Sequence, residues 1–144
     1  GDAVDVDYPL HLLNGRPSSD RPTIEVRGGG RVRLRFVNAG SDTAYRVAVG
    51  GNRMMVTHAD GFPVEPVQVD ALLIGMGERY DVIVEPSSGA WPLVALAEGK
   101  DLTSAAIIRT SDAAASAAPP ASRACACARE PYTSQVYGWC TVRA

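Results

Sequence analysis

The stretch RVRLRFVN, residues 31–38, decides the fold class of this chain. Val32, Leu34 and Phe36 alternate with arginines at every second position. In an extended strand, successive side chains point to opposite faces of the sheet. This period of two therefore separates the apolar side chains from the guanidinium groups. The stretch predicts a strand with one face in a hydrophobic core and the other in water.

The same short-strand pattern extends outward on both sides of this stretch. Further strands are predicted at residues 9–14, 23–27, 45–49, 53–59, 67–74, 79–85, 92–97 and 104–109. No segment shows the 3.6-residue period of an amphipathic helix. Many short strands separated by glycine and proline predict an all-β, antiparallel sandwich or barrel. The residues expected in its core are Val32, Leu34, Phe36, Val47, Val56, Val82 and Val84.

Turns between the predicted strands hold residues with structural roles. Asp60-Gly61 is a strong turn dipeptide, and Gly77 ends a second turn. Tyr80 follows Gly77 by three residues, at the start of a strand. In Greek-key sandwiches a tyrosine so placed often turns its hydroxyl onto nearby backbone. We therefore predict that Tyr80 pins a loop between the two sheets.

The chain is predicted to contain one folded domain with a linker on either side. Residues 1–8 are an N-terminal linker and residues 9–110 form the domain. Residues 111–144 form an Ala/Pro-rich linker and an irregular tail. A domain of this size can bury a core without disulfides or metals. The three cysteines all lie in the tail: Cys125, Cys127 and Cys140.

Composition argues against two classes of partner. The 144 residues include 14 Lys and Arg against 16 Asp and Glu, a net charge of -2 at pH 7. Such a balanced surface lacks the concentrated positive charge that binds nucleic acid. No apolar run approaches the roughly 20 residues of a membrane span, and no signal peptide is visible.

His58 is the candidate metal ligand of the domain, because Met54 and Met55 precede it and Asp60 follows it. A blue-copper site needs two histidines and a cysteine, usually with an axial methionine. The only other histidine is His11, and the predicted domain has no cysteine. We therefore predict a strand histidine that is hydrogen-bonded to its neighbours. A zinc site formed by His11, His58 and a carboxylate is the open alternative.

The remaining motifs carry weaker signals. Met54, Met55 and Met76 are predicted to fill gaps in the core, not to relay copper. The glycine run at residues 28–30 leads into a strand and not into a helix, so it is predicted to be a hairpin connection and not a phosphate cradle. The Cys125–Cys127 pair lacks a nearby third ligand. We predict no catalytic, cofactor-binding or metal-binding residue in this chain.

The motifs taken together resemble a known family. Along residues 10–100 stand, in order, LLNGRP, VRLRFVNAGSDTAYRV, VTHADGFPVEPVQVDALLIGMGERYDVIVE and PLVALAEGK. This series resembles the second plastocyanin-like domain of three-domain, laccase-type multicopper oxidases, especially bacterial ones. Its most specific part is D-G-x-x-V-x-P-x-x-V-D-x-L-x-I-x-x-G-E-R-Y-D. Family members often have histidine where this chain has Asn52, a position that binds no copper in middle domains.

The resemblance implies a cupredoxin-like Greek-key β-sandwich. It implies a parent enzyme outside the cytoplasm (periplasmic, cell-surface or secreted) that takes single electrons from phenols, amines or metal ions and reduces dioxygen to water. In such enzymes the flanking cupredoxin domains hold the copper and the middle domain bridges them. This segment is then expected to be copper-free and inactive by itself. The rival hypothesis is a stand-alone, non-catalytic β-sandwich that binds a partner or serves as a scaffold.

The tail departs from the family pattern and generates a prediction. A three-domain oxidase continues through a linker into a third domain that ends in a His-Cys-His motif. Here the linker-like AAPPASR is followed by ACACAREPYTSQVYGWCTVRA. We predict a frameshift or truncation near Arg123, and resequencing of the locus is expected to show an interrupted frame. An intact frame that runs through Ala144 into a histidine-rich domain would contradict this.

Overall fold

The computed structural model describes residues 8–112, and the regular structure in them is all β. Residues 8–112 include no helix with the length and apolarity needed to cross a membrane. The strands of this part of the chain are β1 (Leu12–Leu13), β2 (Arg16–Pro17), β3 (Thr23–Val26), β4 (Val32–Val37), β5 (Tyr45–Val49), β6 (Met54–Ala59), β7 (Phe62–Val69), β8 (Leu72–Ile74), β9 (Arg79–Val84), β10 (Ala90–Ala97) and β11 (Thr103–Thr110).

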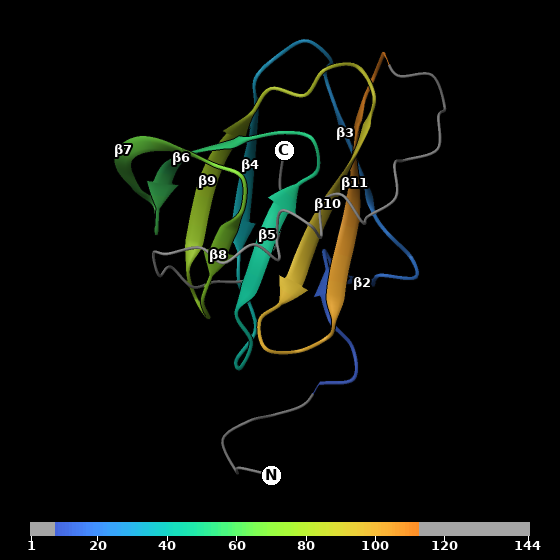
Figure 1. The fold of residues 1–144 in the computed structure, drawn as a ribbon, viewed down its shortest axis with the longest axis vertical. Helices are drawn as coiled ribbons and strands as arrows, with labels where there is room; N and C mark the ends of the chain where they lie inside the picture. Colours follow the sequence, from blue (N-terminus) through green and yellow to red (C-terminus); the bar gives the residue numbers. More distant parts are fainter. Residues whose placement is uncertain (1–7, 113–144) are drawn as a thin grey trace.

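Two sheets form the body of the molecule (Figure 1). The five-stranded sheet has the order β3-β11-β10-β5-β8, and the four-stranded sheet has the order β4-β9-β6-β7. The chain crosses repeatedly between them, since β3 and β5 belong to the first sheet and β4 to the second. Such crossings between two mainly antiparallel sheets produce a Greek-key sandwich. The predicted all-β sandwich is confirmed.

The core lies between the facing sides of the two sheets. All seven residues predicted for it are at most 8% exposed, and Phe36 is fully buried. Along β4 the buried and exposed positions alternate, as the sequence predicts. The opposite side carries ion pairs: Arg33 of β4 with Asp81, and Arg31, the residue before β4, with Glu85 at 3.2 Å. The four-stranded sheet thus has an apolar inner side and a charged outer side.

Two connections differ from the sequence predictions. The glycine run at residues 28–30 does not close a hairpin, because β3 pairs in parallel with β11 while β4 lies in the other sheet. The predicted strand at residues 67–74 is two strands in different sheets, because the chain crosses at Asp70-Ala71. The hairpin prediction for residues 28–30 and the single-strand prediction for residues 67–74 were both wrong. A local apolar pattern contains no information about which sheet a strand joins.

The first half of β7 is a strand that the sequence analysis did not predict. Pro63 and Pro66 interrupt it, and proline is confined to edge strands because it lacks a backbone N–H. The structure places β7 at the edge of the four-stranded sheet, where only β6 pairs with it. The edge position therefore explains how two prolines are tolerated.

We expect Phe36→Ala to lower the free energy of unfolding by about 3–5 kcal/mol, because it removes a fully buried ring and leaves a cavity. Denaturant unfolding of the chain measures this change. Phe62→Ala is the matched control, because Phe62 lies on the same sheet but is 74% exposed. Its expected change is within about 0.5 kcal/mol. Similar losses in the two variants would remove Phe36 from the core.

Candidate functional site

His58 lies on β6, next to a register shift in the pairing of β6 with both of its neighbours. Arg33 Nη2 donates a hydrogen bond to His58 Nδ1 at 3.3 Å, and Thr57 Oγ1, which donates its own proton to the Asp81 carbonyl, lies 3.1 Å from the same nitrogen. Arg33 also forms an ion pair with Asp81. His58 is hydrogen-bonded to its neighbours, as predicted, and a guanidinium group beside Nδ1 repels a metal cation at that atom.

His11 lies in a different environment from His58. It is buried, and its Nδ1 is hydrogen-bonded to the hydroxyl of Tyr45 on β5, in the five-stranded sheet. The two rings meet edge to face with centroids 5.5 Å apart. Across residues 8–112, no group of three or more His, Cys, Asp or Glu residues is arranged to hold a metal ion. The structure therefore does not bring together the His11, His58 and carboxylate set of the zinc alternative.

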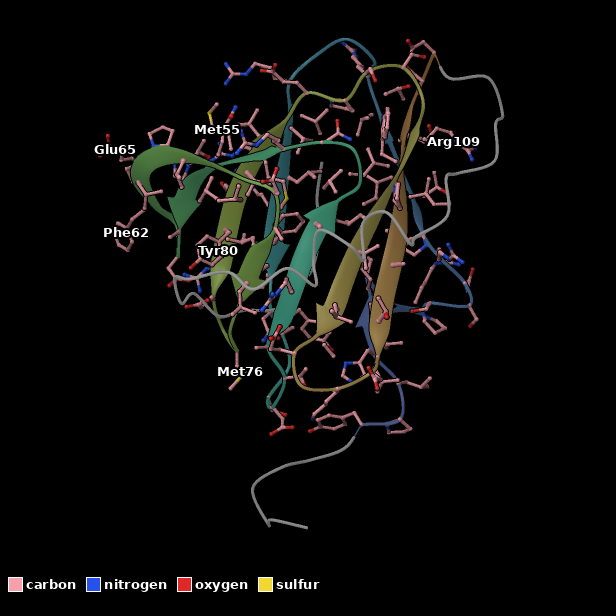
Figure 2. All side chains as sticks on the ribbon, in the orientation of Figure 1. Met55, Phe62, Glu65, Met76, Tyr80 and Arg109 are labelled. Carbon is pink, nitrogen blue, oxygen red and sulfur yellow. The ribbon has the colours of Figure 1, made fainter. Side chains whose placement is uncertain are left out.

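The three methionines occupy three environments. Met54 is fully buried in the core, and Met55 is half-buried on β6. Met76 is 53% exposed in the turn between β8 and β9, away from the sheet centre (Figure 2). The predicted core role is wrong for Met76, because the turn carries its side chain into solvent.

Two turns that lie side by side contain most of the predicted structural residues. Asp60 and Gly61 join β6 to β7 with φ angles of 51° and 88°, which is typical of a two-residue hairpin turn that needs positive φ at both positions. Gly77 lies in the β8–β9 turn with a φ of 81°. Positive φ favours glycine because it has no Cβ to clash.

Arg79 joins these two turns by four hydrogen bonds, which we call the Asp60–Arg79 clasp. The Arg79 N–H donates to Asp60 Oδ1 at 2.9 Å, and the Asp60 N–H donates to the Arg79 carbonyl at 2.7 Å. The Arg79 guanidinium donates to the carbonyls of Asp60 at 3.0 Å and Gly77 at 3.2 Å. Sequence reasoning missed Arg79, although the G-E-R-Y-D motif that contains it was available as a signal.

Tyr80 lies next to the clasp with its ring buried. The residue is 8% exposed and pairs across the sheet with Phe36 on β4 and with Ala59 on β6. In the described part of the chain, the hydrogen bonds across the two turns come from Arg79 and not from the Tyr80 hydroxyl. Burial, followed by the negative charges of Glu78 and Asp60, raises the pKa of Tyr80 to about 12.

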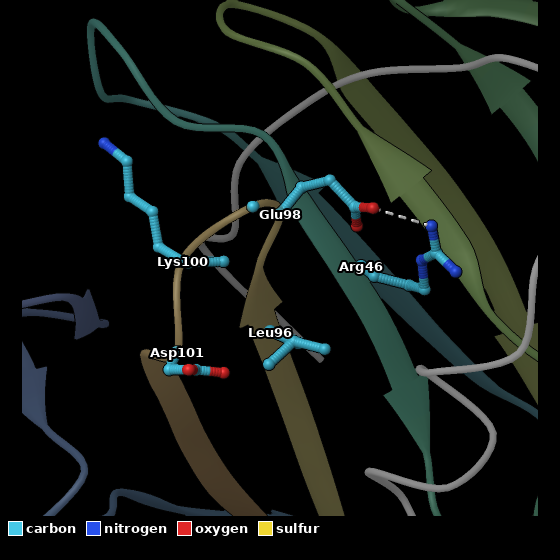
Figure 3. A pocket seen from close by; sticks show the side chains of 7 residues that line it. Arg46, Leu96, Glu98, Lys100 and Asp101 are labelled. Atoms are coloured by element: carbon cyan, nitrogen blue, oxygen red, sulfur yellow. Dashed lines mark hydrogen bonds and ion pairs between the residues drawn. The ribbon is translucent and has the colours of Figure 1, made fainter. Parts of the chain in front are cut away.

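A pocket of about 280 Å³ lies beside the turn between β10 and β11 (Figure 3). Two ion pairs hold its rim: Arg46 Nη2 contacts Glu98 Oε1 at 3.0 Å, and Lys100 Nζ contacts Asp42 Oδ2 at 3.0 Å. Both basic side chains are thus paired with carboxylates, so we assign these charges to fixing the turn. The residues that line the pocket are Arg46, Leu96, Ala97, Glu98, Gly99, Lys100 and Asp101.

Comparison with known proteins assigns the chain to a family. The model of the multicopper oxidase family matches residues 5–113, which is more than half of the chain. The chain belongs to the multicopper oxidase family. Multicopper oxidase MmcO of Mycobacterium tuberculosis is 50% identical over 110 residues, which are 76% of this chain and 22% of that protein. Copper resistance protein A of Escherichia coli is 34% identical over 110 residues, 76% of this chain and 18% of that protein.

Solved structures of multicopper oxidases share the fold. The laccase of Botrytis aclada superimposes with a TM-score of 0.58 at 28% identity, over 69% of this chain and 20% of that chain. A multi-copper oxidase of Pseudomonas thermotolerans gives a TM-score of 0.58 at 28% identity, over 77% of this chain and 25% of that chain. The cupredoxin-like fold class is confirmed. The chain spans about one fifth of the length of the multicopper oxidases that it matches in sequence.

We expect Tyr80→Phe to flatten the dependence of stability on pH between 10 and 12. The folded-state pKa of about 12 lies above the usual value of 10.0, so the neutral phenol favours the folded state. That contribution is complete below pH 10 and is lost as the pH rises toward 12. Denaturant unfolding at several pH values measures the slope of the unfolding free energy against pH, once for the wild type and once for the variant. Parallel slopes in the wild type and the variant would show that folding does not raise the pKa of Tyr80.

Proposed function

We propose that residues 9–110 form the copper-free middle cupredoxin domain of a multicopper oxidase and bridge two copper-bearing domains of the parent chain. The domain is inactive by itself. The parent oxidises phenols, amines or metal ions by single electrons and reduces dioxygen to water, outside the cytoplasm. Residues 1–8 and 111–144 are linker and tail. The frameshift near Arg123 and the roles of Cys125, Cys127 and Cys140 lie outside the described residues.

The environment of the two histidines carries this proposal. A protein copper site needs imidazole nitrogens from different residues aimed at one point. Here His58 faces a guanidinium group and His11 is bonded to a tyrosine of the other sheet. The described residues therefore do not fit the copper that the family name implies. If the parent holds copper, residues outside this segment supply the ligands.

The share of the relatives that the chain covers supports a bridging role. About four fifths of the mycobacterial relative lies outside the matched segment. Those regions leave ample room for further domains with the histidines and cysteine that this segment lacks. The resemblance of residues 10–100 to a second plastocyanin-like domain supports the middle position and the extracytoplasmic location.

We expect the purified 144-residue chain to hold no stoichiometric copper in its domain after incubation with copper and dialysis. Elemental analysis and the absorption spectrum measure this. A variant with serine at Cys125, Cys127 and Cys140 separates the tail thiols from the domain. Any copper bound by the wild type is expected to be lost in that variant. Stoichiometric copper that persists there and is lost on His58→Ala or His11→Ala would overturn the proposal.

A further inference from the structure

Strand β7 exposes more apolar surface than a strand of a sandwich normally does. Its first seven residues are exposed and only Val69 is buried. Phe62 is 74% exposed and Val67 is 51% exposed. Figure 2 shows Phe62 and Glu65 at the outer edge of the four-stranded sheet, beyond Tyr80. A sheet in a sandwich normally buries one face in the core, so β7 has an uncovered face.

The pairing of the strands shows which side of β7 this is. Leu34 lies opposite Val82, Val82 lies opposite Val56, and Val56 lies opposite Val67. Residues directly opposite each other in antiparallel strands point to the same face. The exposed fractions along this row are 0% for Leu34, 0% for Val82, 5% for Val56 and 51% for Val67. Val67 therefore continues a core row into solvent.

A second row repeats the pattern. Phe36 lies opposite Tyr80, Tyr80 opposite Ala59, and Ala59 opposite Phe62. Phe36 is fully buried and Tyr80 is 8% exposed, whereas Phe62 at the end of the row is 74% exposed. Phe62 and Val67 are five residues apart, and they share one side of β7 because a register shift between Val56 and His58 separates the two rows. We call the side that carries these two exposed side chains the inner side of β7. This side points the same way as the core but is not covered.

The lengths of the strands at this edge of the sandwich explain why the five-stranded sheet does not cover the inner side of β7. The five-stranded sheet ends at β8, which has three residues against eight in β7. The chain reaches β8 immediately after β7 through Asp70-Ala71, and the residues on either side of this connection, Val69 and Leu72, are buried. The second layer of the sandwich therefore covers the end of β7 at Val69 but not the half that carries Phe62.

We propose that the inner side of β7 is the docking surface for an apolar, uncharged face of a copper-bearing domain that flanks this one in the parent oxidase. This inference rests on the proposed function and names the surface that performs the bridging. Glu65 is the only charged residue among the eight of β7, so the complementary surface is apolar. Pro63 and Pro66 have no backbone N–H, and proline in an edge strand hinders the addition of a further strand, which favours side-chain packing.

The small size of the surface selects a tethered occupant over a free one. Two large exposed side chains form a much smaller patch than the 1,200–2,000 Å² or so of a stable interface between separate proteins. A domain in the same chain is held at a high effective concentration, so a small apolar contact suffices for it. Since most of the length of the relatives lies outside the matched segment, such a domain is available.

The test uses a chimera in which residues 5–113 of this chain replace the matched segment of the mycobacterial relative. The double variant Phe62→Ser/Val67→Thr removes the apolar side chains of the inner side of β7. We expect it to leave the melting temperature of the 144-residue chain unchanged, because both residues are exposed there. In the chimera we expect a melting temperature lower by several degrees, and amide exchange in residues 62–69 faster by tenfold or more.

Two controls make the test specific. Phe62→Leu/Val67→Ile keeps the surface apolar and is expected to behave as the parent chimera. Leu10→Ser/Leu12→Thr removes apolar residues that are 67% and 45% exposed at the β1–β2 hairpin, and is expected to have little effect. Equal effects of this control and of the β7 variant would overturn the assignment of the surface.

The outcomes separate this inference from the proposed function. An active chimera that is unaffected by the β7 variant would overturn the docking surface and leave the middle-domain proposal standing. A chimera that neither folds nor oxidises substrate, while the unaltered relative does both, would overturn the proposed function and this inference with it. Self-association of the 144-residue chain that is lost in the β7 variant, without any effect in the chimera, would assign the surface to a second copy instead.

Discussion

The two cross-strand rows on the inner side of the four-stranded sheet are the constraint on which the rest of the domain depends. They run from Leu34 and Phe36 on β4 to Val67 and Phe62 on β7. A single buried ring such as Phe36 accounts for about 3–5 kcal/mol, whereas each exposed ion pair on the outer side contributes about 0–1 kcal/mol. Burial of the rows therefore sets the stability, and the outer charges keep that side wetted.

The Asp60–Arg79 clasp fixes the register of the Phe36–Phe62 row, and a register shift between Val56 and His58 separates this row from the Leu34–Val67 row. A slip of one residue between β6 and β7 would turn the apolar set of one strand to the opposite face. The two-residue turn at Asp60-Gly61 sets the pairing of Ala59 with Phe62, and Arg79 holds that turn against the start of β9. Local hydrogen bonds at this end of the sheet thus decide which side chains of the Phe36–Phe62 row lie on the inner side.

The sequence is informative where a local pattern and the tertiary structure agree. The alternation in β4 and the turn at Asp60-Gly61 depend on neighbouring residues, and the structure places both as their patterns indicate. The parallel pairing of β3 with β11 and the change of sheet after Val69 depend on residues far apart, so no local pattern carries them.

The candidate site shows the same division. The sequence shows how many histidines there are, but it does not show their neighbours. Arg33 beside His58 and Tyr45 beside His11 come from other strands. Arg79 was missed because its role depends on contact with a turn 19 residues away. The clasp could be seen only once β6 and β9 were paired.

The four-stranded sheet has its charges on the outer side and exposed apolar side chains on the inner side of β7, and this separation determines which side suits contact with another domain. Arg33 and Arg35 of β4, and Arg31 just before it, project from the outer side of the sheet, where their ion pairs stay in water. A domain that covers Phe62 and Val67 on the inner side gains apolar burial and leaves those ion pairs hydrated, so it avoids the large cost of removing charges from water. The same argument disfavours contact through the outer side, where every apolar gain would be offset by desolvation of charged groups. The distribution of charge across one sheet therefore directs an incoming domain to β7.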